Sequence, residues 1–132
     1  MSQENVEIVR RALTEFDESQ RLSAAFAPNF IFEGRTFRGA PIFEYHGWEG
    51  FFEFFEDWVD AYDVWEQEIG QILDGRGDRV AVLAHQRGRL RGTQDWVELD
   101  YGIVYTVTDG LIRRVELYRT AEEALEAAGV RR

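Results

Sequence analysis

The stretch from Tyr45 to Trp65 separates apolar from acidic positions more cleanly than any other part of the chain. On a helical wheel of about 100° per residue, one arc holds the bulky apolar side chains Phe51, Phe54, Phe55, Trp58, Val59 and Tyr62, with Phe52 at its margin. The opposite arc holds the acids Glu49, Glu53, Glu56, Asp57, Asp60 and Asp63. A helix with so bulky an apolar face must bury it against another layer of the protein. The pattern therefore predicts a helix that covers a curved sheet and leaves a pocket beneath it.

Helical patterns also precede this stretch. Apolar residues at helical spacing predict a first helix from Gln3 to Asp17. A short second helix is expected from about Ser19, with Leu22, Ala25 and Phe26 buried, and Pro28 prevents its continuation. Asn29 to Glu33 is a predicted strand that ends at Gly34, and Thr36 to Pro41 is expected to be irregular chain or a short edge strand.

From Tyr62 onward the pattern becomes strand-like, and the predicted strands are Val64 to Leu73, Arg79 to Arg89, Gln94 to Thr108 and Leu111 to Arg119. Asp109-Gly110 is a strong signal for a two-residue hairpin. Thr120 and Glu123 form a capping box for a final short helix, with Gly129 as its C-cap. This order predicts a single α+β domain over residues 1–132, in which a curved, mostly antiparallel sheet wraps around helices on its concave side. Incomplete cover by helices predicts a cone-shaped fold with a central pocket.

Composition and charge narrow the classes of partner. The 132 residues suit one domain. A net charge of −10 argues against nucleic acid or an anionic membrane as partner. The absence of cysteine excludes disulfides and thiolate chemistry, and the absence of lysine excludes Schiff-base chemistry. No apolar signal core opens the N-terminus and no segment is long enough to span a membrane, so a cytoplasmic protein is expected.

Several segments carry a family resemblance: ENVEIVRRAL, AFAPNFIFEG, YHGWEGFFEFFEDW and the C-terminal ELYRTAEEALEAAGV. Together they resemble the SnoaL-like polyketide cyclase family of the nuclear transport factor 2-like (NTF2-like) superfamily, and the C-terminus is similar to those of actinobacterial members. The resemblance implies a cone-shaped pocket, no obligatory cofactor, and a homodimer built on the outer face of the sheet. It also implies that acid–base groups of related enzymes would fall near Ile103 and Leu117, which are apolar here.

Tyr101 is the first candidate for chemistry. Alternation along the strand from Gln94 to Thr108 places Leu99, Tyr101, Ile103, Tyr105 and Val107 on one face. Because that face is apolar, it should face the core, and the Tyr101 hydroxyl could then donate a hydrogen bond to a carbonyl or enolate oxygen. The alternative is a core tyrosine whose hydroxyl bonds to backbone or water.

His85 and Glu33 are the other two catalytic candidates. His85 follows the apolar run Val80 to Ala84, and a neutral imidazole on a pocket wall would suit a general base. A polar position without a catalytic role is the alternative. Glu33 ends the strand after Pro28, where a carboxylate at the rim of an aromatic cavity could move protons. The alternative is an exposed glutamate at a strand end.

The expected ligand is a small hydrophobic molecule, aromatic or carbonyl-bearing, held by a wall of Phe16, Phe32, Phe55, Trp58 and Tyr105. Acid–base chemistry of the cyclase or isomerase type would use Tyr101, His85 and Glu33. The competing hypothesis is a non-catalytic ligand-binding or dimeric accessory domain, which predicts that these three residues do not converge or that aromatic side chains fill the cone completely. The two histidines have no metal-ligand spacing, and the helical acids are assigned to a solvated face, so no metal site is expected.

Overall fold

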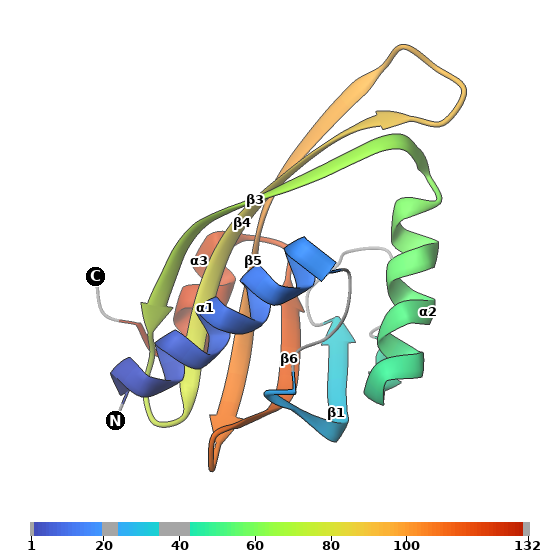
Figure 1. Cartoon of the computed structure of the whole chain (residues 1–132). Coiled ribbons are helices and arrows are strands. Elements are labelled where there is room, and N and C mark those ends of the chain that lie inside the picture. Colours follow the sequence, from blue (N-terminus) through green and yellow to red (C-terminus); the bar gives the residue numbers. More distant parts are fainter. Residues whose placement is uncertain (1, 20–23, 35–42, 131–132) are drawn as a thin grey trace.

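The computed structural model describes residues 2–19, 24–34 and 43–130 (Figure 1). The elements follow one another as α1 (Ser2–Ser19), β1 (Phe26–Gly34), β2 (Glu44–His46), α2 (Gly47–Val59), β3 (Tyr62–Asp74), β4 (Arg79–Leu90), β5 (Trp96–Thr108), β6 (Leu111–Tyr118) and α3 (Ala121–Ala128). Two helices therefore flank a pair of strands early in the chain, and an antiparallel meander fills most of its second half.

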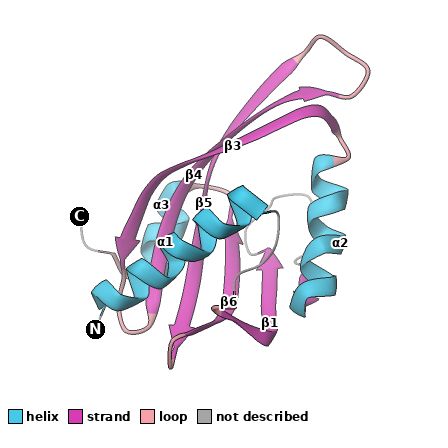
Figure 2. Ribbon diagram, in the orientation of Figure 1, coloured by secondary structure: helices cyan, strands magenta, loops and turns pink. Residues whose placement is uncertain are grey.

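The strands form one six-stranded sheet in the order β2-β1-β6-β5-β4-β3. Every neighbouring pair is antiparallel except β1 and β6, which run parallel. Figure 2 shows the sheet curving around α1, with α2 beside its β1 end and a long arm of β3, β4 and β5 extending past both. The predicted α+β class with a curved, mostly antiparallel sheet is confirmed.

The hairpin between β5 and β6 and the end of α3 both contain residues with positive φ. Asp109 and Gly110 have φ values of 55° and 76°, as a two-residue hairpin between β5 and β6 requires. Thr120 accepts a hydrogen bond from the backbone N–H of Glu123 at 3.1 Å and caps α3. Gly129, with φ of 72°, ends that helix. The predicted hairpin and both ends of the last helix are confirmed.

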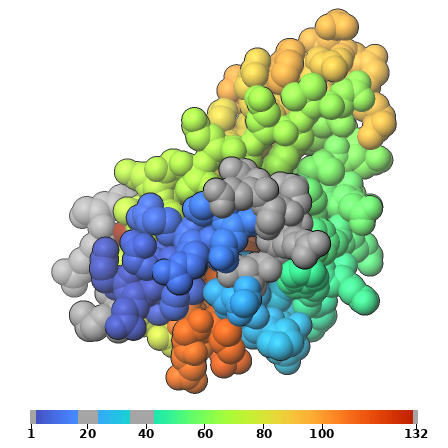
Figure 3. Space-filling view, viewed as in Figure 1, coloured from blue at the N-terminus to red at the C-terminus, as the bar shows by residue number. Residues whose placement is uncertain are grey.

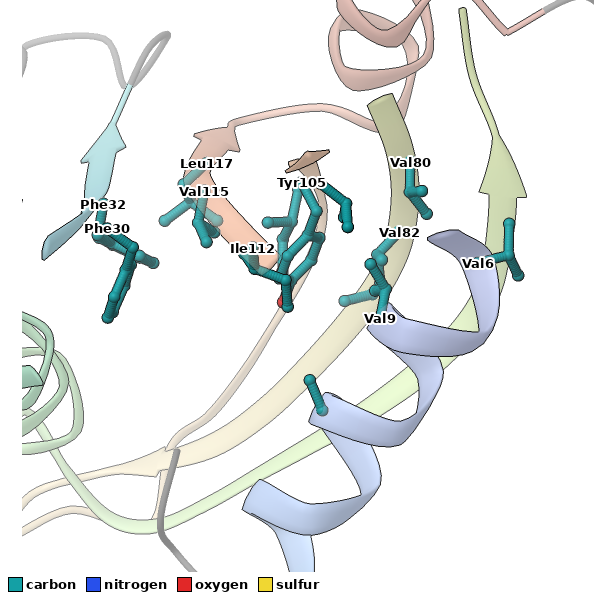
Figure 4. Close-up of a cluster of buried hydrophobic side chains, with 14 of the residues drawn as sticks. Val6, Val9, Phe30, Phe32, Val80, Val82, Tyr105, Ile112, Val115 and Leu117 are labelled. Atoms are coloured by element: carbon teal, nitrogen blue, oxygen red, sulfur yellow. The ribbon is translucent and has the colours of Figure 1, made fainter. Parts of the chain in front are cut away.

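The two faces of the sheet carry different helices. Val80 and Val82 of β4 pack in one buried cluster with Val6 and Val9 of α1 (Figure 4). We call this the inner face of the sheet. The alternate residue Ala81 belongs to a second cluster on the outer face, which contains Ala124, Leu125 and Ala128 of α3. The expectation that all helices cover the concave side is therefore wrong for α3, which packs on the outer face where Gly102 has no side chain to block Ala124.

The large helix is shorter than the Tyr45 to Trp65 prediction. It spans Gly47–Val59, and the chain then turns at Asp60 and Ala61 into strand β3. Trp65 is paired with Gly88 of β4, so it belongs to the sheet. The helical wheel continues past Val59 because apolar residues recur there, but pairing with β4 determines the conformation.

The short helix expected from Ser19 is also corrected where the structure describes it. Residues 20–23 and 35–42 lie outside the described residues, and with them Leu22 and the Thr36 to Pro41 segment. Ala25 is in a turn and Phe26 already belongs to β1. Pro28 is therefore inside a strand, and it lies where the β1–β6 pairing shifts register between Phe26 and Ile31. A proline is tolerated at such an irregularity because no ladder hydrogen bond needs its missing N–H.

Candidate functional site

A cavity of about 890 Å³ lies between α1, α2 and the inner face of the sheet. Its lining comes from both helices and from β1, β3, β5 and β6. The space-filling view in Figure 3 shows α1 lying across the front of the molecule, with α2 and the β3–β5 arm beside it. Four aromatic residues of α2 line the cavity and yet are only partly buried, namely Phe51, Phe54, Phe55 and Trp58. They are partly exposed because their inner side borders open space.

Phenylalanine rings form one wall of the cavity. Phe16 of α1 meets Phe51 and Phe55 of α2 edge-on, with ring centroids 5.7 and 5.5 Å apart. Phe32 of β1 meets Phe54 at 4.6 Å. All five wall residues predicted from the sequence, Phe16, Phe32, Phe55, Trp58 and Tyr105, line the cavity. Their part in binding a ligand stays a prediction.

Gln86 is a residue that the sequence prediction missed. Its side chain is almost fully buried, with 2% exposure, at an inner-face position of β4. Its Oε1 accepts hydrogen bonds from the indole nitrogens of Trp58 at 2.8 Å and Trp65 at 3.1 Å, and its Nε2 donates to the Tyr62 hydroxyl at 3.2 Å. The Gln86 amide therefore connects β4 to the last turn of α2 and to the start of β3. It also orients two indoles that line the cavity.

Tyr101 lies on the inner face, as predicted, and lines the cavity. Its hydroxyl donates a hydrogen bond to Oε1 of Gln67 on β3. On the β4 strand between them, Tyr101 pairs with Ala84 and Gln67 pairs with Gln86, so the bond crosses the sheet diagonally. Burial, with a smaller contribution from Tyr105, raises the pKa of Tyr101. The phenol is therefore a neutral hydrogen-bond donor and not a base at neutral pH.

His85 lies on the outer face, away from the cavity. Its Nδ1 is 2.6 Å from a carboxylate oxygen of Asp100, and its Nε2 is 2.8 Å from one of Glu98. Hydrogen bonding to Asp100, and then to Glu98, raises the pKa of His85. The prediction of His85 on the pocket wall is wrong, because it alternates with the inward residues Ala84 and Gln86.

Glu33 also lies on the outer face. Its carboxylate is buried and forms an ion pair with Arg114 of β6. Both residues alternate with neighbours that line the cavity, Phe32 and Val115. The expectation of an exposed strand-end or a cavity-rim position is therefore wrong. Of the three catalytic candidates, only Tyr101 lines the cavity, and the structure does not bring the three together.

A protein-family comparison assigns the fold. The model of the SnoaL-like domain matches residues 8–115, which is most of the chain. The chain belongs to the SnoaL-like domain family. A search of curated proteins found no significant match.

Solved structures of similar shape agree with this assignment. An NTF2-like protein from Burkholderia thailandensis E264 has a TM-score of 0.73 at 20% identity, covering 94% of this chain and 95% of that one. TerC, co-crystallised with polyporic acid, has a TM-score of 0.69 at 20% identity, covering 93% and 98%. A candidate SnoaL-like polyketide cyclase from Jannaschia sp. CCS1 has a TM-score of 0.67 at 18% identity, covering 99% and 95%. At these identities the likeness establishes the NTF2-like fold alone.

The polar side chains on the inner face of this SnoaL-like domain are neutral, and Arg10 of α1, which also contributes to the cavity lining, is exposed and pairs with Glu7 at 3.5 Å. Glu66 and Glu68 contribute to the lining, but they alternate with inward-facing Gln67, and Glu66 bonds to Arg87 at 3.3 Å. Among the described side chains, no carboxylate or imidazole points into the cavity. Ile103 and Leu117, which the family resemblance aligns with acid–base groups of related enzymes, both line the cavity and are apolar.

The described part of the SnoaL-like domain offers few other sites. Glu53, Glu56, Asp57 and Asp60 are exposed along α2, as the helical wheel predicts for a solvated face. No group of three or more histidine or acidic residues among the described residues is arranged to hold a metal ion. None of the described helices combines the length and apolarity that crossing a membrane requires.

Proposed function

We propose that this SnoaL-like domain binds a small, largely apolar molecule between the phenylalanine wall and the inner face of the sheet. The observation that carries the proposal is the open cavity of about 890 Å³, which lies in the size range of small-molecule sites, roughly 300–1,000 Å³. Its lining combines many aromatic side chains with a few neutral polar groups, and the charged residues that contribute to it, Arg10, Glu66 and Glu68, are exposed. Such a lining is typical of sites in which apolar contact supplies affinity and a few hydrogen bonds set orientation.

The relatives support a small-molecule ligand. TerC, a protein of similar fold, was co-crystallised with polyporic acid. Another protein of similar fold bears the name of a candidate polyketide cyclase. For this chain we propose only that its cavity binds an organic molecule, as the cavity of such a fold can.

Binding without acid–base catalysis is the form of the proposal that the geometry favours. Proton transfer at neutral pH needs a group whose pKa lies near the working pH. Tyr101 is a neutral phenol with a raised pKa, and His85 and Glu33 lie on the other face of the sheet. The homodimer that the family resemblance implies belongs to this proposal and is compatible with either function.

Catalysis is the second candidate, and Tyr101 is the residue that favours it. A buried phenol beside an amide can stabilise a developing oxyanion by hydrogen bonding, without transferring its proton. A cyclase- or isomerase-type reaction of this kind would need the substrate itself to supply or accept the proton. It predicts turnover that Tyr101→Phe abolishes while ligand affinity is kept, whereas pure binding predicts no turnover in either protein.

Intrinsic fluorescence tests the proposal without a known ligand. Trp58 and Trp65 line the cavity, whereas Trp48 and Trp96 are exposed, by 45% and 43%. We expect a panel of aromatic ketones to include compounds that quench the wild-type emission saturably. Trp96→Phe should keep that response, and Trp58→Phe should lose a large part of it. A panel that produces no saturable quenching, or quenching that Trp96→Phe removes, contradicts binding in this cavity.

A further inference from the structure

Two tyrosines of β5, four residues apart, face the cavity with different hydrogen bonding. Tyr101 and Tyr105 are each 5% exposed, and both line the cavity. The Tyr101 hydroxyl donates to Gln67. No described residue forms a hydrogen bond with the Tyr105 hydroxyl. Tyr101 is therefore satisfied within the protein, and Tyr105 is not.

The Tyr105 hydroxyl borders open space. In the described part of the chain, every fully buried side-chain nitrogen or oxygen atom has a hydrogen-bond partner. Since the Tyr105 oxygen has none, it keeps some accessible surface, and the residue lines the cavity. In Figure 4 its ring extends from β5 between the side chains of Ile112 and Val82. A phenol held in such a place takes its acceptor from outside the protein, either water or a ligand in the cavity, because leaving a largely buried donor unpaired is costly.

The surroundings of Tyr105 restrict what that acceptor can be. Its neighbours across the inner face are Val80 of β4 and Val115 of β6, followed by Phe32 of β1. All three are buried apolar side chains. A charged ligand atom would find no opposite charge among them, and an ion in an apolar site loses its hydration without compensation. A neutral oxygen, such as a carbonyl, avoids that cost.

We infer that Tyr105, and not Tyr101, anchors the polar group of the ligand, and that this ligand is a neutral, flat aromatic molecule with a carbonyl-type oxygen at its edge. The inference rests on the proposed function, since it specifies the occupant of the same cavity. The ring system lies against the phenylalanine wall, and the oxygen accepts the Tyr105 O–H hydrogen bond. Tyr101 keeps its bond to Gln67 and contributes only apolar contact. Burial raises the pKa of Tyr105, so the phenol remains a donor across the physiological pH range.

Two ring systems that differ by one oxygen provide the test. 9-Fluorenone carries a carbonyl oxygen where fluorene has a methylene group, and both are neutral and flat. Equilibrium dialysis would measure both dissociation constants for the wild type, Tyr105→Phe and the matched control Tyr101→Phe. We expect the wild type to prefer fluorenone about five-fold, the value of one neutral hydrogen bond. Tyr105→Phe should bring the ratio to about one, and Tyr101→Phe should leave it unchanged.

Fluorene affinity shows whether each variant keeps an intact cavity, because fluorene has no oxygen for either tyrosine to contact. Retained fluorene binding in Tyr105→Phe, with the fluorenone preference lost, supports the inference. A wild type that binds both compounds equally, or a preference that Tyr101→Phe removes and Tyr105→Phe retains, overturns the inference while leaving the proposed function intact. A wild type that binds neither compound overturns the inference and contradicts the proposed function. A Tyr105→Phe protein that loses fluorene binding as well also overturns it, because Tyr105 would then act on the cavity as a whole.

Discussion

His85 and Gln86 are adjacent in β4 and have opposite surroundings. His85 lies on the outer face between two carboxylates, Asp100 and Glu98. Gln86 lies on the inner face, where its neutral amide pairs with two indoles and a phenol. The inner face thus contains a neutral hydrogen-bonding group next to the cavity, and the outer face contains an imidazole between two carboxylates.

The difference has a physical cause. A buried charge needs an opposite charge and further hydrogen bonds, whereas a buried amide needs hydrogen-bond partners alone. Gln86 obtains three partners from Trp58, Trp65 and Tyr62 without placing any ion beside the cavity. An apolar ligand that lies against the inner face of the sheet therefore meets neutral side chains. This arrangement suits binding better than proton transfer.

Replacing Gln86 should have the larger effect on stability. In Gln86→Leu, two indole N–H groups lose their acceptor, and each such loss costs about 1–3 kcal/mol when water cannot replace it. We expect the free energy of unfolding to fall by about 2 kcal/mol, and ligand quenching of Trp58 and Trp65 emission to weaken. Urea unfolding measures the first effect, and a fluorescence titration measures the second.

Gln71→Leu is the matched control for Gln86→Leu. Gln71 is exposed on β3 and pairs with outward-facing Leu83, so the same substitution there should change stability by no more than about 0.5 kcal/mol. Equal losses in the two variants would show that the Gln86 network contributes nothing beyond the loss of an ordinary surface amide.

Replacing His85 should have a smaller effect that depends on pH. Its pKa is raised in the folded protein from an ordinary value of 6.5, so its stabilising interaction is fully present below that value and is lost as pH rises through the folded pKa. The unfolding midpoints of wild type and His85→Gln should therefore differ most near pH 6 and converge toward pH 9. Thermal melts across this range measure the difference.

Ligand affinity provides the second half of the His85 prediction. Because His85 lies on the outer face, His85→Gln should bind the same cavity ligand as tightly as the wild type at each pH. A stability difference that grows as pH rises, or an affinity that falls in His85→Gln, would contradict the placement of His85 away from the site.

Sequence patterns gave the correct face where one side of an element is polar. In β5, the alternation of Tyr101, Ile103 and Tyr105 with Glu98 and Asp100 revealed the inner face. In α2, the acidic arc did the same. The alternation in β1 also indicated the outer face for Glu33, because the inward-facing Phe30 and Phe32 alternate with it. The prediction nevertheless placed its carboxylate at a cavity rim.

The sequence did not indicate which residues of β4 face inward and which face outward. Its run from Val80 to Ala84 is apolar at every position, because α1 packs on one face and α3 on the other. A strand buried on both sides loses the alternation that separates the two faces. His85 could therefore be assigned to the wrong face, and Gln86, which lies on the inner face, was overlooked. The end of α2 was hidden for a similar reason, since apolar residues continue into β3.

Filling the cavity tests the central claim most directly. Ile69 lies on the inner face of β3 and lines the cavity, whereas Gln71 on the same strand is exposed on the outer face. Equilibrium dialysis of 9-fluorenone would compare the wild type with Ile69→Trp and Gln71→Trp, after circular dichroism has established that both variants are folded. The structure predicts that Ile69→Trp loses at least ten-fold in affinity, about 1.4 kcal/mol, and that Gln71→Trp binds like the wild type. Equal binding by all three proteins would show that the cavity is not the site.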